Sequence, residues 1–242
     1  LKDETFQALE GVKRYGGESW FMLGDRDLAT HIQRAEGLAR GESPSQVTDR
    51  LRRALGVTAR ILPMAEEPCR TMIDTESDGT LPFQQWFVRH RAQPKVRKVW
   101  LDGDPPASPA ALHALAEAEL VIIGPSNPYV SIDPILSRPG LRDALRGRVV
   151  IAVSPIIAGR AVKGPLAEMI PALSGQPASA AAIAGHYGSL LSGLVLERGD
   201  ETAVRGVAVH ACDTLMKSRE DRVRLGRECL AFANSLREGS SS

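Results

Sequence analysis

Two short apolar runs, each followed by a polar loop, constrain the fold of this chain more than any other feature. The first run is Leu120–Ile123 and the second is Val149–Val153, and neither contains a charged residue. Strands buried on both faces have this composition, which is typical of parallel sheets. In open α/β sheets, ligands bind beyond the carboxyl ends of the strands. The sequence therefore predicts an α/β fold with a ligand site in the loops after these strands.

Polar side chains occupy both loops. Ser126 and Asn127 follow the first strand, while Ser154 follows the second, with Lys163 and Gly164 a few residues further on. Amides and hydroxyls can bind an anion or a nucleobase edge, and a cation beside a helix N-terminus suits a diphosphate. One such loop alone is better explained as an ordinary turn with a surface lysine. Because two such loops follow neighbouring strands, we favour a nucleotide or phosphate ligand.

In the rest of the chain, the spacing of apolar residues predicts further helices and strands around these two strands. Asp3 is the expected cap of the first helix and Ser218 that of the last. After a first helix at 3–15, one expected helix runs through His31, Ile32 and Leu38, and others lie at residues 45–55, 110–119, 139–146, 164–173 and 179–186. Further strands are expected at residues 57–62, 95–101, 190–196 and 204–210.

An antiparallel hairpin is also expected. Residues 70–75 and 83–89 alternate between apolar and polar side chains, and Asp78-Gly79 lies between them as a turn signal. We predict that this hairpin is inserted into, or attached to, a mostly parallel sheet. The chain is interpreted as one α/β domain over residues 1–238, with a disordered tail at 239–242. Because it begins with Leu1 and not with Met, we expect residues upstream of it in the natural protein.

Composition excludes several classes of protein. Of the 242 residues, 30 are Lys or Arg and 29 are Asp or Glu, which gives a net charge of +1. This balance argues against a general nucleic-acid binder and against a polybasic membrane protein. No apolar run is long enough for a membrane span, and no signal peptide is visible. The three cysteines have no CxxC spacing, which favours a reduced, cytoplasmic setting without a zinc site.

The segment Asp25-Arg26-Asp27 allows two interpretations. Asp25 or Asp27 can cap the helix that follows it. Alternatively, Arg26 contacts an anion while the carboxylates bind hydroxyls or a metal, although two carboxylates alone are a weak metal signal.

Covalent catalysis is disfavoured by the motifs. The chain has no Gly-x-Ser-x-Gly elbow, no cysteine at a familiar spacing from a histidine, and five scattered histidines. His186-Tyr187 is the pair that we expect to close over a ligand. Catalysis would then depend on positioning and charge neutralisation, as in phosphoryl transfer.

Four stretches, in order over nearly the whole chain, resemble signatures of the 2-phospho-L-lactate transferase family. They are WFMLGDRDLATH at 20–31, GPSNPYVSIDPIL at 124–136 followed by Pro139-Gly140, VSPI at 153–156 with Gly159, Ala161 and KGP at 163–165, and DTLM at 213–216.

This resemblance implies a fold and a reaction. The fold would be a Rossmann-like three-layer α/β sandwich, commonly a homodimer. Such enzymes build the deazaflavin coenzyme F-420, and Mg²⁺ assists them. They transfer a phospholactyl, phosphoenolpyruvyl or phosphoglyceryl unit from a guanosine diphosphate-linked donor to the ribityl hydroxyl of the deazariboflavin Fo, and GMP leaves.

One part of the family pattern does not occur in this chain. Family members open with a strand and a Gly-Gly-x-Gly-Gly loop, followed by an Asp-Asp pair and a Pro-Asp-Leu-Asp-Thr segment. These motifs supply metal and acceptor contacts. We therefore expect no metal ligands in this chain and place them upstream of Leu1.

The resemblance also implies site residues. Near the acceptor we expect Trp20, Gly24, Asp25, Arg26 and Asp27, with Lys2, Asp3 and Thr5 at the border of its pocket. Toward the guanosine donor we expect Ser126, Asn127, Pro128 and Ser131, and toward its phosphates Ser154, Lys163 and Gly164. The catalytic groups are not identified, and Asp25 and Asp27 are the candidates.

Two rival functions stay open. A regulatory protein on a related fold would bind a nucleotide or nucleotide-sugar without chemistry, and the missing carboxylates favour it. A dehydrogenase is disfavoured because no dinucleotide fingerprint is present. The motifs at 20–31 and 213–216 favour the transferase.

Overall fold

A four-stranded parallel sheet is the base of the candidate site. The computed structural model describes residues 4–201 and 204–239. The sheet has the order β4-β5-β8-β9, formed by Leu120–Ile123, Val149–Val153, Gly193–Glu197 and Ala208–Cys212. All neighbouring pairs are parallel, with Ile122 opposite Ile151 and Leu194 opposite Val209. The predicted α/β class is confirmed.

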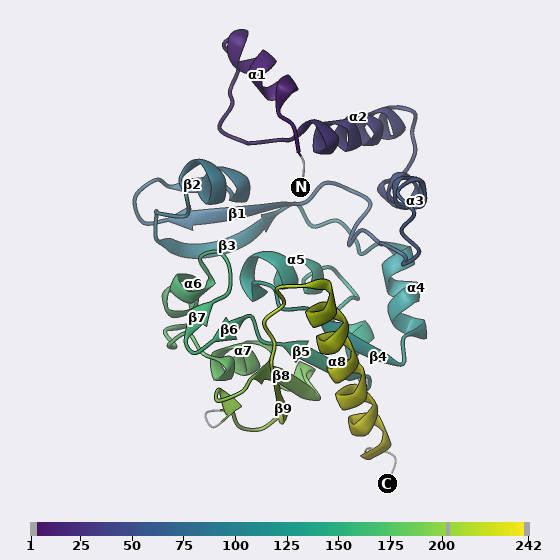
Figure 1. The fold of residues 1–242 in the computed structure, drawn as a ribbon, viewed down its shortest axis with the longest axis vertical. Helices are drawn as coiled ribbons and strands as arrows, with labels where there is room; N and C mark the ends of the chain where they lie inside the picture. The colour runs from purple at the N-terminus through teal and green to yellow at the C-terminus, as the bar shows by residue number, and fades with distance from the viewer. Residues whose placement is uncertain (1–3, 202–203, 240–242) are drawn as a thin grey trace.

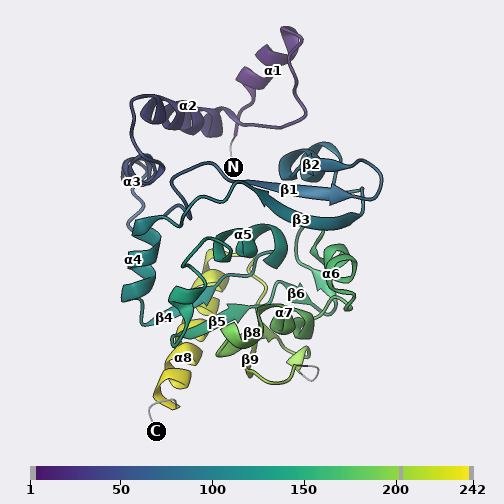
Figure 2. The same cartoon turned by 180° about the vertical axis from the view of Figure 1, so that it is seen from behind.

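Both faces of this sheet are covered, which explains its continuous apolar strands. Val150 and Ala152 of β5 pack on one face with α5, Asp133–Leu136, α6, Leu166–Ser174, and α7, Ala180–Tyr187. Ile151 and Val153 lie on the other face, where they meet Leu225 and other side chains of α8, Arg219–Gly239. Figures 1 and 2 show α8 running along its own side of the sheet. Full burial of a Val, Leu or Ile side chain, such as that of Val150 or Ile151, contributes about 1.5–3 kcal/mol to folding.

The expected hairpin exists, but it belongs to a separate sheet. β1, Arg70–Thr75, pairs antiparallel with β2, Thr80–Pro82, and with β3, Val96–Asp102, so the order is β2-β1-β3. The hairpin is therefore not part of the parallel sheet, and it lies above that sheet in Figure 1.

The predicted strand at residues 83–89 is wrong. Gln85–Arg89 forms a π-helical turn, η1. Its Trp86 is buried, and the indole N–H donates a 2.8 Å hydrogen bond to the carbonyl of Pro94. Burial of one large aromatic side chain on the inner side of the turn outweighs the short alternating pattern.

Three helices precede the antiparallel sheet in the chain. They are α1, Gln7–Arg14; α2, Asp25–Ala39; and α3, Pro44–Ala54. In Figure 1, α1 and α2 lie at one end of the molecule beyond this sheet, whereas α3 lies to its side. Ser43 and Gln46 form a capping box at α3. The expected strand at 57–62 is wrong, because these residues form no strand and the side chains of Val57 and Ile61 are exposed.

Shorter elements lead into the parallel sheet from β3 or connect its strands. They are α4, Pro109–Glu117; η2, a π-helical turn at Pro128–Ile132; η3, Asp143–Leu145; β6, Ile156–Ile157; β7, Arg160–Ala161; and η4, Gly188–Leu190. The predicted helix at 139–146 is reduced to the 3₁₀ turn η3. No helix among the described residues has the length and apolar character that a bilayer crossing requires.

The C-terminal helix starts as expected. The Ser218 cap is confirmed, since its hydroxyl accepts the amide hydrogen of Asp221 at 3.2 Å. Gly239 still belongs to α8, whereas the rest of the predicted tail, residues 240–242, lies outside the described residues.

Candidate functional site

A cavity of about 520 Å³ lies where the strands of the parallel sheet end. We call it the sheet-end cavity. Its lining comes from the loop after β4, from Ser154 and Pro155 after β5, and from residues 214–216 after β9. This is the edge at which parallel α/β sheets bind ligands.

The cavity brings together six of the seven residues predicted to face the donor. They are Ser126, Asn127, Ser131, Ser154, Lys163 and Gly164. Pro128, the seventh, is buried at the first position of η2 and does not line the cavity. The loops after β4 and β5 are distant in sequence, but they meet because parallel strands share a carboxyl edge.

Local hydrogen bonds fix the shape of the two loops. The Asn127 Oδ1 accepts the backbone N–H of Tyr129 at 3.0 Å and so caps η2. Its Nδ2 lies 3.3 Å from the sulfur of Met169. The buried Ser154 hydroxyl accepts the amide hydrogen of Ile156 and donates to the carbonyl of the same residue. These two side chains therefore shape the wall of the cavity that they line.

Other lining groups are free to meet a ligand. The hydroxyls of Ser126 and Ser131 have no hydrogen-bond partner in the described part of the chain. Lys163 is exposed, and Gly164 beside it has a φ of +69°, a left-handed conformation that favours glycine. A side chain at this position would strain the loop that presents Lys163.

The charge of the lining favours an anion. Lys163 and Arg222 are its charged residues, and none of the described lining residues is Asp or Glu. Arg222 comes from the first turn of α8, whereas Lys163 precedes α6. Two cations from separate elements raise the local concentration of an anionic ligand.

Among the lining residues that were not predicted from the sequence, three have an aromatic or charged side chain. Phe83 and Phe87 stack with ring centroids 5.4 Å apart and an interplanar angle of 8°, and Arg222 is the third. The four-residue spacing of the two phenylalanines is a helical signal that was available in the sequence. Arg222 had no such signal, because only packing decides which side of α8 faces the cavity.

The predicted acceptor residues lie elsewhere. The Asp25 carboxylate accepts hydrogen bonds from the Thr5 hydroxyl at 2.6 Å and from the amides of Gln7 and Ala8 at 3.0 Å. These bonds, led by that from Thr5, lower the pKa of Asp25 below its ordinary value. Asp25, the first residue of α2, thus caps the N-terminus of the earlier helix α1, while the N-cap position of α2 itself is Gly24. The predicted capping of α2 by Asp25 or Asp27 is therefore wrong.

Position 24 requires a glycine because the side chain of Glu4 lies directly against its backbone. A Cβ at this position would collide with the side chain of Glu4, whose Oε1 accepts the amide hydrogen of Arg26 at 2.9 Å.

The predicted acceptor residues that the structure describes do not line the sheet-end cavity; they are Thr5, Trp20, Gly24, Asp25, Arg26 and Asp27. Lys2 and Asp3 lie outside the described residues, so the predicted Asp3 cap does too.

A chain of contacts nevertheless connects this segment with the cavity. The Trp20 indole N–H donates to Glu18 at 3.1 Å, and Glu18 lies 3.4 Å from the guanidinium of Arg89. Arg89 ends η1, which also carries Phe87. Glu18, two residues before the 20–31 segment, thus lies beside the turn that lines the cavity.

The described residues do not offer a metal site. Within 4–201 and 204–239, no group of three or more His, Cys, Asp or Glu side chains is placed to hold a metal ion. The described lining of the sheet-end cavity also lacks the carboxylates that Mg²⁺ prefers. The residues present therefore do not fit this ion.

The buried thiols are unsuited to nucleophilic chemistry. Burial raises the pKa of Cys229 to about 11 and also raises that of Cys212. Both remain protonated near neutral pH, and the thiol is a poor nucleophile.

His186 and Tyr187, the pair expected to close over a ligand, do not line the sheet-end cavity. The Nε2 of His186 lies 3.0 Å from a carboxylate oxygen of Asp133.

Comparison with known proteins identifies the family. Residues 2–224 match the family described as 2-phospho-L-lactate transferase CofD. The chain is 40% identical over 227 residues to a 2-phospho-L-lactate transferase of Methanosarcina mazei, covering 91% of this chain and 74% of that protein. It is 39% identical over 247 residues to a phosphoenolpyruvate transferase of Thermobifida fusca, covering 98% and 76%.

The fold also has a solved counterpart. A UPF0052 family protein from Bacillus halodurans is similar with a TM-score of 0.58 at 14% identity, covering 85% of this chain and 71% of that one. This likeness concerns the fold alone. From the family match and the curated relatives, the chain belongs to the 2-phospho-L-lactate transferase family and is a transferase enzyme.

Proposed function

We propose that this transferase moves a phospho-hydroxyacid unit from a guanosine diphosphate-linked donor to the ribityl hydroxyl of Fo in coenzyme F-420 biosynthesis. The acceptor oxygen would form a bond to the donor's distal phosphorus, the bond from that phosphorus to the bridging oxygen would break, and GMP would leave. The hydroxyl proton would pass to solvent. The transferred unit is phospholactyl, phosphoenolpyruvyl or phosphoglyceryl.

The charge of the sheet-end cavity carries this proposal. Lys163 and Arg222 line it without a described carboxylate, which suits a diphosphate. The free hydroxyls of Ser126 and Ser131 suit the polar edge of a guanosine. Both cations would also stabilise the negative charge that builds up on the leaving GMP.

The other parts of the proposal come from the family resemblance. We keep Thr5, Trp20, Gly24 and Arg26 as proposed neighbours of the acceptor, supported by the contacts that lead from Trp20 to η1. Mg²⁺, a homodimer and a cytoplasmic location are proposed with them. No step is assigned to Mg²⁺, because the described lining residues do not fit it. The family membership favours the transferase over a regulatory nucleotide binder.

Calorimetric titration with GDP and with Fo, each with and without Mg²⁺, tests the proposal. We expect saturable binding of both ligands, followed by product formation with one of the three donors. Binding of GDP alone, unaffected by Mg²⁺, would instead support the regulatory protein.

A further inference from the structure

A cavity of about 630 Å³ lies along β3, an outer strand of the antiparallel sheet. We call it the β3 groove. Five consecutive residues of β3, 97–101, line it, and residues of η2, α5 and α7 form the facing wall. It shares no described lining residue with the sheet-end cavity, and His186 is part of its lining. Its volume is within the usual range of small-molecule sites.

A buried arginine with unused donors forms part of the wall. Arg138 is only 4% exposed and lines the groove. Its Nη1 donates to the carboxylate of Asp104 at 3.0 Å and to the carbonyl of Pro105 at 3.3 Å, and its Nη2 donates to the hydroxyl of Ser137 at 3.3 Å. A guanidinium has five N–H groups, so two have no acceptor among the described residues, and one of these is on the buried Nε. Because an unpaired buried donor is unfavourable, this wall favours a ligand that carries acceptors.

The charges around the groove favour an anion. Asp104 and Asp133 are the acidic residues of the described lining, and each already faces a basic side chain. Asp104 pairs with Arg138, and Asp133 lies 3.0 Å from Nε2 of His186. Lys98 is exposed and has no partner in the described part of the chain. The groove therefore keeps one cation that is available to a ligand.

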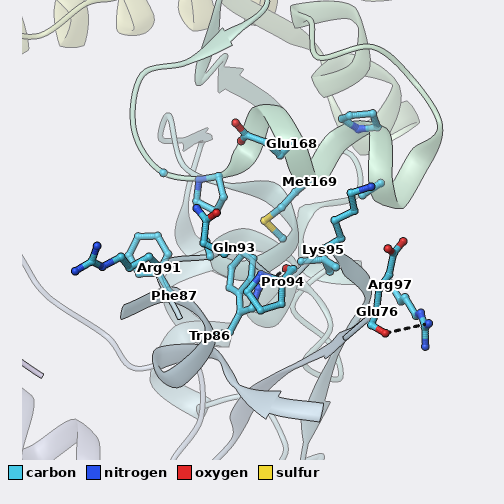
Figure 3. Close-up of a pocket in the computed structure, with 16 residues that line it drawn as sticks. Glu76, Trp86, Phe87, Arg91, Gln93, Pro94, Lys95, Arg97, Glu168 and Met169 are labelled. Carbon is cyan, nitrogen blue, oxygen red and sulfur yellow. Dashed lines mark hydrogen bonds between the residues drawn. The ribbon is translucent and has the colours of Figure 1, made fainter. Parts of the chain in front are cut away.

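An exposed indole lies next to this cation. Trp100 follows Lys98 by two positions in β3, so both side chains lie on the same face of the strand. The Trp100 side chain is 38% exposed. Arg97, on the opposite face, is already held: it also lines a larger cavity of about 960 Å³, shown in Figure 3, where its Nη2 donates to the carbonyl of Glu76 at 3.3 Å. An indole beside an ammonium group suits a flat ring that carries an anionic group.

We propose that the β3 groove is a second ligand site, which binds a phosphate monoester that carries one flat ring. The phosphate would contact Lys98 and the unused donors of Arg138, and the ring would pack on Trp100. A phosphate monoester has three acceptor oxygens, which is enough for these donors. Tyr129 connects the two sites. Its ring lines the groove and packs edge-on against His186 with centroids 4.7 Å apart, while its amide donates to Asn127 of the sheet-end cavity at 3.0 Å.

Calorimetric titration with phenyl phosphate tests the site. The protein is first saturated with GDP, so that the sheet-end cavity is occupied. The titration is repeated without GDP in the Lys163→Ala/Arg222→Ala double variant, which lacks the two cations of that cavity. We expect one saturable site for phenyl phosphate in both experiments, because neither change alters the lining of the β3 groove.

Substitutions in the groove identify the contacts. Lys98→Ala and Trp100→Ala should each weaken phenyl phosphate binding by about tenfold, since one removes the cation and the other the ring surface. Lys95→Ala is the matched control, because Lys95 is an exposed lysine just before β3 that does not line the groove, and its variant should bind normally. Inorganic phosphate, which has no ring, should bind the wild-type protein about tenfold more weakly than phenyl phosphate.

Four results would overturn the proposal. They are no saturable binding by the folded wild-type protein, unchanged affinity in both folded groove variants, equal affinity for inorganic and phenyl phosphate, and loss of binding both with GDP present and in the double variant. The last result would assign the ligand to the sheet-end cavity. Failure of GDP to bind the wild-type protein would refute the proposed donor, and the double variant would still decide whether the β3 groove binds phenyl phosphate.

Discussion

The hydroxyl of Thr214 donates a 2.6 Å hydrogen bond to Oε2 of Glu197, and the Thr214 amide donates a second bond to the same oxygen at 2.7 Å. Glu197 ends β8, so it fixes the lining segment that follows β9. Thr214 is buried, so its polar groups depend on this partner.

Glu197→Ala should therefore weaken both folding and ligand binding. Leaving buried donors unpaired costs about 1–3 kcal/mol. Urea unfolding should show that loss, and titration should show weaker GDP binding. Glu67→Ala, at an exposed position, is the control. Wild-type behaviour of Glu197→Ala in both measurements would contradict the role of this contact.

Lys163→Ala and Arg222→Ala should each lower affinity for GDP by about tenfold, as expected for the loss of one charge-assisted contact. Guanosine, which lacks the diphosphate, should lose much less. Lys217→Ala removes an exposed charge just before α8 and outside the cavity, so it is the matched control. Equal losses for GDP and guanosine would show that the two cations do not contact the phosphates.

Asn127 combines two roles that two substitutions can separate. Asn127→Ala removes the cap of η2 and the Nδ2 donor, so we expect guanosine affinity to fall by about 1–3 kcal/mol and stability by about 1 kcal/mol. Asn127→Asp keeps an oxygen for the cap and should restore stability, but not affinity. Recovery of affinity in Asn127→Asp would mean that the amide donor does not contact the ligand.

Acid should loosen the packing of α1 against α2. The pKa of Asp25 is lowered in the folded protein, so its contribution to stability is present above the ordinary carboxyl pKa and is lost as pH falls through the folded value. Hydrogen-exchange protection factors of residues 7–14 should fall below about pH 4. Asp25→Asn should show low protection at every pH, and Asp27→Asn should resemble wild type. Protection factors independent of pH in the wild-type protein would refute this role of Asp25.

The loops after β4 and β5 were predictable because their signal is local. An uncharged strand followed by Ser, Asn or Gly is visible in a short window, and parallel strands bring the loops at 126 and 154 to one edge without further information. This is why the structure assembles Ser126, Asn127, Ser154 and Lys163 as expected.

Other parts of the fold and of the site depend on contacts between residues that are far apart in the sequence, or on burial that a local pattern does not reveal. Asp25 caps α1 and not its own helix, through hydrogen bonds from residues 17 and 18 positions earlier. The 83–89 segment follows a strand-like alternation, yet burial of Trp86 turns it into η1. Arg222 reaches the cavity only because α8 packs on the sheet with that side inward.

Both π-helical turns touch the sheet-end cavity, η1 through Phe87 and η2 through Val130 and Ser131. In each, an amide bonds the carbonyl five residues earlier, as His90 does to Gln85 and Ile132 to Asn127. Removing a single codon would tighten either turn to the ordinary α-helical spacing and rotate its side chains out of the cavity. The shape of the cavity thus depends on the five-residue hydrogen-bond spacing of these two turns.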